Sequence, residues 1–451
     1  MKSNPWLASY LIGNSPDRYA QLEHRAVPQS IKGESIAARA EVLRAQMREV
    51  FLCGDQTSLL LDQLLAIGEG HALTHYGSSQ QVLSAIYHQD PWGEATQPAL
   101  MLTGLAGTGK TQIMQAMRRL LRTRVGRVDL PGHHNLEILP AWFMSLREGN
   151  TLNSLLGPWV VPDRAGSVGV EIPNKKDLKQ AHLMQLARRV SRRDGVCIIF
   201  LDEFQFITNS PQANALAMTL LLQLLSVGPR VIYVANYSLV RRLLNRRQED
   251  RHRVLVNHLE LQPDAMDSAD FLNYIRELTR IVPADFRFEP QVVASLLHRY
   301  TYGIKRAVVE LLVRAWAHSK IHRGAQADVT ESDLKAAYAS SGYMPFRNDV
   351  EALWRHSVRD KNIDPDLLNP LRTETPASNV VVAQAAINDF NRRVNERHVQ
   401  GMLTPSERDA LSKLEPPRKA LSSEGKVRRL PVGATSKESL LNVFSRLGDD
   451  L

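Results

Sequence analysis

Residues 99–112 read ALMLTGLAGTGKTQ, and they give the clearest indication of fold class in this sequence. The apolar run 99–103 predicts a short buried strand, and the residues from Lys110 to about Arg122 have the spacing of a helix. Between them lies a glycine-rich turn. A strand, a glycine-rich turn and a helix in this order are typical of a loop that holds phosphate at a helix N-terminus.

The turn fits the pattern G-x-x-x-x-G-K-[ST] at every position. Glycines allow backbone N–H groups to surround phosphate, and the helix N-terminus adds the positive end of its dipole. In this motif Lys110 reaches the β- and γ-phosphates and the Thr111 hydroxyl binds Mg²⁺. A chance glycine-rich turn is the competing interpretation, which the agreement of motif and context disfavours. We expect ATP and Mg²⁺ as cofactors, with the nucleotide held by Gly104, Leu105, Ala106, Gly107, Thr108, Gly109, Lys110, Thr111 and Gln112.

Two apolar runs farther along the chain end in polar residues that suit nucleotide hydrolysis. The run 196–201, VCIIFL, precedes Asp202 and Glu203, and the run 230–235, RVIYVA, precedes Asn236. Because ligands of open α/β sheets bind at the carboxyl ends of the strands, we expect Asp202 near the Mg²⁺. Glu203 would polarise the attacking water, and Asn236 would orient that water or contact the γ-phosphate. The alternative is that all three are ordinary polar residues at strand ends.

Strands and helices alternate through the central part of the chain. A further strand is predicted at 140–146, and helices are predicted at 177–193 and 211–227. This alternation implies a parallel sheet covered by helices on both faces. From about 263 to 340 the pattern is helical throughout. We therefore predict an α/β fold divided into a mostly helical N-terminal extension (1–95), an α/β domain (96–262), a small all-helical lid (263–342) and a C-terminal extension (343–451).

The two extensions contain further predicted elements. A helix is predicted at 38–52 and another at 379–397. A basic linker at 415–434 leads to an amphipathic helix at 435–447 that begins with the spacing of a capping box. This last helix would either tether a partner or pack on the body of the same protein.

The composition is that of a globular protein, with 43% hydrophobic and 23% charged residues among 451. The two cysteines, Cys53 and Cys197, exclude a disulfide framework and a cysteine zinc site of the usual spacing. No apolar run is long enough to span a membrane, and the start lacks the apolar core of a signal peptide. We therefore expect a cytoplasmic protein. The net charge of +9 favours a polyanionic partner.

Several cations downstream are candidates for contact with the γ-phosphate. Arg251 and Arg253 lie just before the predicted last strand, where one of them would act as an arginine finger on the nucleotide of a neighbouring subunit. Arg306, or its neighbour Lys305, opens a helix of the lid and would reach back to the γ-phosphate. For all four residues a solvated surface position is the alternative.

Taken together, these features resemble AAA+ ATPases. The run Asp202-Glu203-Phe204-Gln205 resembles the Walker B segment of the TnsC/TniB family, whose members are AAA+ regulators of DNA transposition. The pattern of that family also fits segments 143–146, 149–152, 234–239 and 302–306. The resemblance spans roughly residues 95–340, and neither flank contains a matching motif.

The resemblance implies roles for single residues and for the whole chain. Six residues match the motifs of the P-loop, Walker B, sensor 1 and sensor 2: Lys110 and Thr111, Asp202 and Glu203, Asn236, and Arg306, respectively. Neither candidate for the arginine finger carries over cleanly. ATP-loaded protomers would assemble as rings or filaments on duplex DNA and would link a target-selector protein to transposase subunits. Hydrolysis would disassemble the oligomer, and strand transfer would belong to the partner.

DNA contact is predicted for the segment after the second strand, because this segment lines the DNA path in related ATPases. The candidates are Arg147, Asn150, Thr151, Lys175 and Lys176, which would hold backbone phosphate with little sequence specificity. A solvated loop is the alternative for each of them. Two other functions stay open: a replication initiator or helicase loader of the AAA+ class, and a signalling or secretion ATPase that binds no DNA.

Overall fold

The computed structural model describes residues 4–13, 15, 17–28, 31–87, 97–146, 151–160, 180–202, 211–356 and 364–371 of the chain. The helices predicted at 379–397 and 435–447 and the linker at 415–434 lie outside these residues. The described elements form a five-stranded sheet flanked by helices, a two-stranded hairpin and a bundle of helices.

All strands of the main sheet run parallel, as the sequence predicts, in the order β4-β5-β6-β1-β7. The strands are β1 Leu100–Gly104, β4 Ala141–Ser145, β5 Ile198–Asp202, β6 Arg230–Ala235 and β7 Asn257–Leu261. β1 lies between β6 and β7, and its Leu102 is opposite Val234 on one side and Leu259 on the other. The carboxyl ends of the strands therefore meet at one edge, where the glycine-rich loop follows β1.

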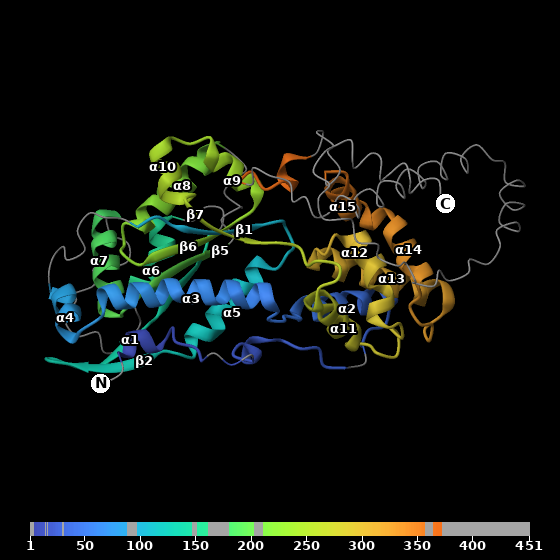
Figure 1. Cartoon of the computed structure of the whole chain (residues 1–451), viewed down its shortest axis with the longest axis horizontal. Coiled ribbons are helices and arrows are strands. Elements are labelled where there is room, and N and C mark those ends of the chain that lie inside the picture. Colours follow the sequence, from blue (N-terminus) through green and yellow to red (C-terminus); the bar gives the residue numbers. More distant parts are fainter. Residues whose placement is uncertain are drawn as a thin grey trace, which may run out of the picture. The chain divides into compact units, whose positions relative to one another are not determined.

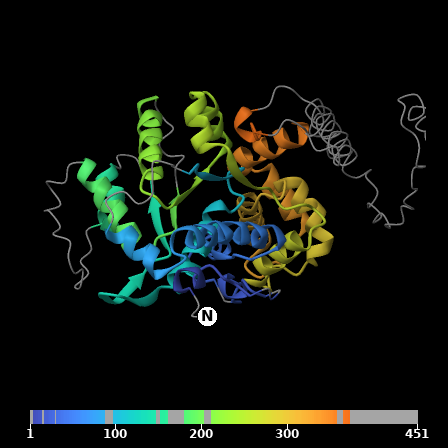
Figure 2. The ribbon, with the colours of Figure 1, turned by 60° about the vertical axis from the view of Figure 1, so that its left-hand side comes forward.

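Alternate residues of the strands face two different cores. Met101 and Ile199 face a core made with α6 Leu152–Val160, α7 Gln180–Arg193, α8 Pro211–Leu225 and α9 Tyr237–Leu244. Leu102 and Phe200 face a second core made with α3 Asp55–His75 and α5 Lys110–Arg122. Figure 1 and Figure 2 show the green helices and the blue α3 on opposite sides of the sheet. Burial on both faces explains why the strands are continuous apolar runs.

The helices predicted in this region agree closely with the structure. The helix after the glycine-rich loop is α5, and those predicted at 177–193 and 211–227 are α7 and α8. Residues 177–179 lie outside the described chain. A further helix, α10 Gln248–Val254, precedes β7, which is the predicted last strand.

A β-hairpin that the sequence pattern does not predict lies between α5 and β4. β2 Gly126–Leu130 pairs antiparallel with β3 His133–Ile138, and the register shifts between Val128 and Leu130. Its Leu130 and Ile138 are buried in the core that contains α3 and α5. The two strands are short and rich in polar residues, so they lack the sustained alternation on which a strand prediction depends.

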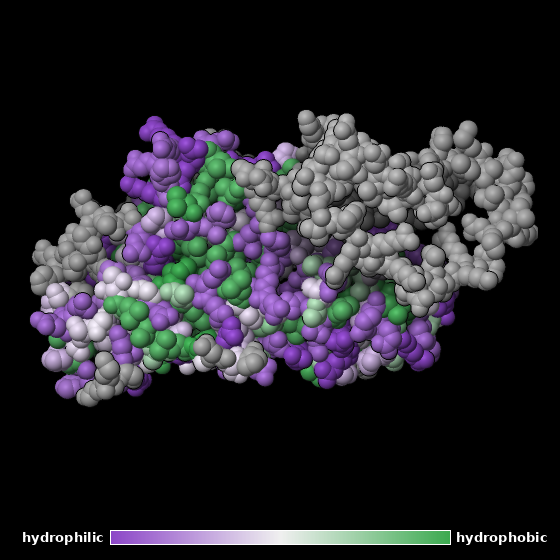
Figure 3. Space-filling view, in the orientation of Figure 1, coloured by the Kyte–Doolittle hydropathy of each residue, from purple (hydrophilic) through white to green (hydrophobic). Residues whose placement is uncertain are grey.

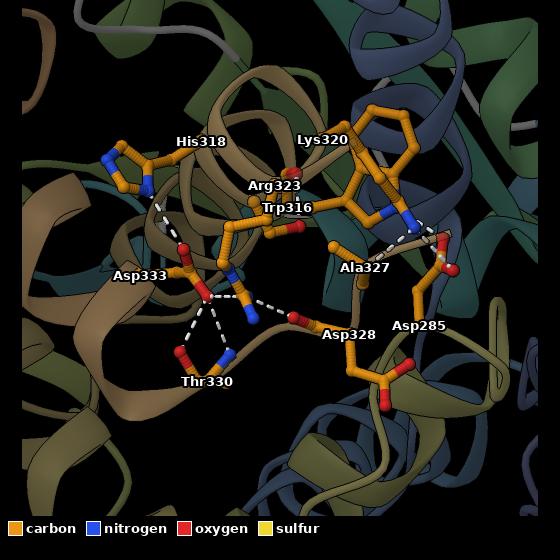
Figure 4. A network of polar contacts seen from close by, with 10 residues as sticks. Asp285, Trp316, His318, Lys320, Arg323, Ala327, Asp328, Thr330 and Asp333 are labelled. Carbon is orange, nitrogen blue, oxygen red and sulfur yellow. Dashed lines mark hydrogen bonds and ion pairs between the residues drawn. The ribbon is translucent and has the colours of Figure 1, made fainter. Parts of the chain in front are cut away.

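The helices after β7 share one core, and helical structure continues through 263–340 as predicted. They are α11 Ala269–Arg280, α12 Pro290–Thr301, α13 Lys305–Arg323, α14 Glu331–Ala339 and α15 Met344–His356, the last of which continues the bundle past 342 into the predicted C-terminal extension. We call this bundle the lid. Within it, Asp285 accepts hydrogen bonds from Trp316 Nε1 and Lys320 Nζ, each at 2.7 Å (Figure 4). These contacts fix α13 to the connection between α11 and α12.

A second polar contact fixes α13 to the start of α14 (Figure 4). The buried Asp333 accepts hydrogen bonds from the Thr330 backbone N–H at 2.8 Å and from His318 Nδ1 at 2.9 Å. Arg323 pairs with the same carboxylate. Because the buried carboxylate has both neutral and charged donors, the penalty for its desolvation is offset.

The described part of residues 1–95 contributes to the core of the lid and to the core on the α3–α5 side of the sheet. α2 Ile36–Glu49 packs on α13, and its Leu43 and Met47 are buried in the core of the lid. α1 Pro5–Ala8, α3 and α4 Ser79–Tyr87 instead contribute to the core on the α3–α5 side of the sheet. The domain boundaries stay a prediction, but this stretch is not a separate body appended to the α/β domain.

None of the described helices is long and apolar enough to cross a membrane. Figure 3 shows hydrophobic residues gathered on the visible face mainly over the α/β part, whereas hydrophilic residues cover most of the visible face of the lid.

Candidate nucleotide site

The P-loop, residues 104–111, lies between the end of β1 and the start of α5, and its geometry requires glycine. Gly107 has a φ of +87°, and a Cβ at this position would lie 2.7 Å from the Cβ of Arg306. Gly104 has a φ of +149°, and a Cβ there would lie 2.3 Å from the carbonyl oxygen of Leu261 in β7. A larger residue at either position would displace the loop. The glycines thus let the P-loop lie against both β7 and the lid.

The Lys110 ammonium is buried beneath the P-loop. It donates hydrogen bonds to the carbonyl oxygens of Gly104 at 2.8 Å and Leu105 at 2.7 Å. Burial and the nearby Arg306 guanidinium lower the pKa of Lys110 to about 7, although Asp202 acts in the opposite direction. The lysine therefore hydrogen bonds to two neutral acceptors. An anionic phosphate can take their place and accept a stronger, charge-assisted hydrogen bond.

Thr111 and Asp202 meet at the carboxyl edge of the sheet. Thr111 Oγ1 lies 3.5 Å from Asp202 Oδ1, and Asp202 is the last residue of β5. One hydroxyl and one carboxylate suit Mg²⁺, which completes its shell with phosphate oxygens and water. Among the described residues, no group of three or more His, Cys, Asp or Glu would hold a metal ion alone. Glu203, the predicted base, lies outside the described residues.

A pocket of about 430 Å³ opens over the P-loop. Besides the loop and Gln112 of α5, it is lined by Val234 and Asn236 at the end of β6 and by residues from α2, α11 and α13: Arg48, Tyr274, Lys305, Arg306 and Val309. Asn236 is the N-cap residue of α9. The structure therefore brings Asn236 and Arg306, which lie far from the P-loop in the sequence, to one pocket with Lys110 and Thr111.

The start of α13 contacts the P-loop directly. The Arg306 backbone N–H donates a hydrogen bond to the Gly107 carbonyl oxygen at 3.1 Å. Next to this bond, Leu105 of the loop and Ile304 of the lid are buried in one apolar cluster. The P-loop and the lid are therefore joined directly at this point.

The two lid cations differ in their partners. The Lys305 ammonium lies 3.9 Å from the Asp264 carboxylate and 5.5 Å from the centre of the Tyr274 ring. Arg306 instead lies close enough to Lys110 to help lower the pKa of that lysine. Both cations line the pocket. The pocket is therefore compatible with either Arg306 or Lys305 as the residue that reaches the γ-phosphate.

The N-terminal part supplies one pocket residue, Arg48, that sequence reasoning missed. Gln112 Nε2 donates hydrogen bonds to the carbonyl oxygens of Arg48 at 2.9 Å and Val50 at 3.3 Å. These bonds join the end of α2 to the helix that follows the P-loop. The sequence 38–52 shows only a helical apolar pattern, and no local signal indicates that its last turn reaches a nucleotide pocket.

Arg251 and Arg253, the candidates for the arginine finger, lie on α10 at the opposite end of the sheet from the P-loop. The Arg253 carbonyl oxygen accepts a hydrogen bond from the backbone N–H of Ala99, the residue before β1. Five strand residues, or about 16 Å, separate this point from the P-loop. Figure 3 shows hydrophilic residues over α10 at the upper left. Neither arginine lines the pocket, so a role as a finger requires a neighbouring subunit.

Of the candidate DNA contacts, only Thr151 lies within the described residues. Thr151 precedes α6, and its Oγ1 accepts a hydrogen bond from the Ser154 backbone N–H at 3.3 Å. Its side chain is therefore engaged in capping the helix. The other candidates lie outside the described chain: Arg147, Asn150, Lys175 and Lys176.

Comparisons with known proteins give one family and several solved structures. Residues 94–244 match the model of the AAA domain family, whereas comparison with curated proteins finds no match. Similar structures include Orc1 of Aeropyrum pernix in complex with DNA, with 18% identity, a TM-score of 0.36, and coverage of 71% of this chain and 83% of that one. A Walker-type ATPase of Pyrococcus abyssi has 13% identity, a TM-score of 0.36, and coverage of 69% and 87%. Domain III of DnaA from Thermotoga maritima has 12% identity, a TM-score of 0.32, and coverage of 64% and 92%.

The family match covers the strand, loop and helix that form the P-loop, and it extends through β5 and β6 to α9. Together with the parallel five-stranded sheet, it identifies the α/β part of this chain as an AAA+ P-loop domain.

Proposed function

We propose that this chain is an ATP-dependent regulator of DNA transposition. It oligomerises on duplex target DNA, links a target-selector protein to transposase subunits, and is released when ATP is hydrolysed. The observation that carries the ATP-dependent part is the hydrogen bond between Arg306 and Gly107, which couples the lid to the phosphate loop. The transposition part is supported by the resemblance of segments 143–146, 149–152, 202–205, 234–239 and 302–306 to the TnsC/TniB family.

Each pocket residue has a role in this proposal. Lys110 exchanges its carbonyl partners for the β- and γ-phosphates, and Thr111 and Asp202 hold Mg²⁺, which neutralises developing phosphate charge when bound. Asn236 orients the attacking water, and Glu203 polarises it. Arg306 contacts the γ-phosphate, so the lid attachment differs before and after hydrolysis.

Assembly and DNA binding rest on charge and placement. We assign the arginine finger to Arg251 or Arg253 acting on a neighbour's nucleotide, because neither lines the pocket of its own chain, and this role requires an oligomer. The net charge of +9 exceeds what one nucleotide pocket uses, and we assign the surplus to the DNA backbone. Contacts of this kind depend little on sequence and weaken steeply with salt.

The test uses Glu203→Gln in the full chain, with Lys110→Ala as the control. Glu203→Gln is expected to bind ATP, to hydrolyse it poorly and to accumulate as an oligomer on duplex DNA that retains transposase. Lys110→Ala is expected to bind neither ATP nor transposase. Retention of a replicative helicase in place of transposase would favour the initiator or loader class. An oligomer that forms to the same extent with and without DNA would favour a signalling or secretion ATPase.

A further inference from the structure

The pocket over the P-loop is lined both from the sheet and from helices. Asn236 lines it after β6, and Arg48, Tyr274 and Val309 line it from α2, α11 and α13. In the function proposed above, the γ-phosphate and the attacking water lie at Asn236. The nucleoside end of the ligand then lies toward the three helices.

We propose that Arg48 is a nucleoside-binding residue whose guanidinium stacks on a purine base, and that Glu310 positions it. This inference rests on the proposed ATP binding, and it adds a specificity determinant supplied by the N-terminal part of the chain.

Arg48 is anchored at both its side chain and its backbone. Its Nη2 lies 2.7 Å from Oε1 of Glu310, a side chain that is only 5% exposed, whereas the Arg48 side chain is 57% exposed. Its carbonyl oxygen accepts the hydrogen bond from Gln112 on the helix that follows the P-loop. A guanidinium held at its edge by a carboxylate leaves its flat faces available for stacking. Since Arg48 is already held in place, little rotamer entropy remains to be lost on binding.

The other two residues at this end are also suited to a flat base. Tyr274 is a buried aromatic residue, and Val309 is a buried aliphatic one beside Glu310. A planar cation, an aromatic ring and an aliphatic side chain favour an electron-rich aromatic ligand over another phosphate. A purine offers more stacking area than a pyrimidine, so the arrangement selects ATP or GTP over CTP or UTP.

Arg44 provides a matched control one turn earlier on α2. Its Nε lies 2.9 Å from Oε1 of the same Glu310, but it does not line the pocket. Arg44→Ala therefore removes one cation from α2 and one partner from Glu310 without changing the proposed base contact.

The experiment measures the dissociation constants of ATP and CTP for the full chain by calorimetry. Arg48→Ala is expected to weaken the binding of ATP roughly 3- to 30-fold and the binding of CTP by less, so that the preference for ATP falls. Arg44→Ala should keep the preference of the unmodified chain. Arg48→Lys keeps the charge but loses the planar face, so its preference should match that of Arg48→Ala.

Glu310→Gln tests positioning, with melting temperatures measured in parallel to check folding. It should lower the preference for ATP when Arg48 is present and have no further effect on that preference in Arg48→Ala. Equal losses of affinity for ATP and CTP in Arg48→Ala would overturn the stacking role. So would an Arg48→Lys variant that kept the full preference for ATP over CTP. If the unmodified chain bound no more ATP than Lys110→Ala, the proposed ATP binding would fail and this inference with it.

Discussion

Lys110 illustrates how a single residue prepares the site for its ligand. Its ammonium is buried and hydrogen bonds to two neutral carbonyl oxygens, and its pKa lies near 7 instead of the ordinary 10.5. Between these two values the unfolded chain binds a proton that the folded chain releases, so stability rises as the pH increases from about 7 toward 10.5. Below pH 7 the charged form is buried and opposes folding.

Phosphate binding should reverse this shift, because an anion restores the preference for the charged lysine. At pH 8 we therefore expect ATP binding to take up a fraction of a proton. Calorimetry in two buffers of different ionisation enthalpy measures this uptake as a difference in apparent enthalpy. A binding enthalpy that is independent of the buffer at pH 8 would contradict the assigned state of Lys110.

Gly107 lies where the P-loop meets the lid. Comparing its substitution with that of a glycine elsewhere separates the effect of the close contact from the effect of backbone strain. Gly107→Ala places a methyl group 2.7 Å from Arg306 Cβ at a φ of +87°. We expect it to abolish ATP binding and to destabilise the fold by more than about 1 kcal/mol. Gly228 has a φ of +125° but open space around its Cβ position. Gly228→Ala should cost about 1 kcal/mol and leave ATP binding intact. Equal ATP binding by the two variants would refute the role of the contact.

At the scale of elements, the sequence predicts what is local and regular. The P-loop with β1 and α5, and the apolar strands β5 and β6, are all predicted because spacing and burial leave a periodic signal. The hairpin 126–138 is not, since two short polar strands carry little period. The pocket contribution of Arg48 is also not predicted, because it depends on packing between α2 and a helix more than 250 residues later. Such a contact is decided by the tertiary structure and leaves no trace in a local pattern.

The polar cluster at the start of α14 is expected to be important for the stability of the lid. Asp333→Ala would remove the acceptor shared by the Thr330 N–H, His318 and Arg323, at a cost of about 2 kcal/mol. Glu331 lies on the same helix, and its ion pair with Lys335 at 3.6 Å is exposed. Glu331→Ala should change stability by less than about 0.5 kcal/mol. Urea unfolding of both variants provides the comparison, and similar losses would argue against a special role for Asp333.

For the whole molecule, the proposed arginine finger on α10 predicts that hydrolysis needs two subunits. Arg253 lies beside the start of β1, whereas the P-loop follows its end. At least one of Arg251→Ala and Arg253→Ala should bind ATP normally but hydrolyse it roughly 1,000-fold more slowly.

Mixing makes this prediction specific to oligomers. The slow arginine variant binds ATP but lacks the finger, and Lys110→Ala retains the finger but binds no ATP. Their mixture should regain part of the ATPase activity. Wild-type hydrolysis by both arginine variants would remove α10 from the mechanism, and a mixture that stays inactive would contradict a finger supplied by the neighbour.

In the proposed function, one assembly couples ATP turnover to duplex DNA. The most direct measurement is the ATPase rate of the full chain with and without duplex DNA of unrelated sequences, repeated as salt is raised. We predict that every duplex stimulates hydrolysis, that the stimulation fades steeply with salt, and that Lys110→Ala shows none. An ATPase rate that is unchanged by DNA at low salt would contradict the proposed coupling of ATP turnover to duplex DNA.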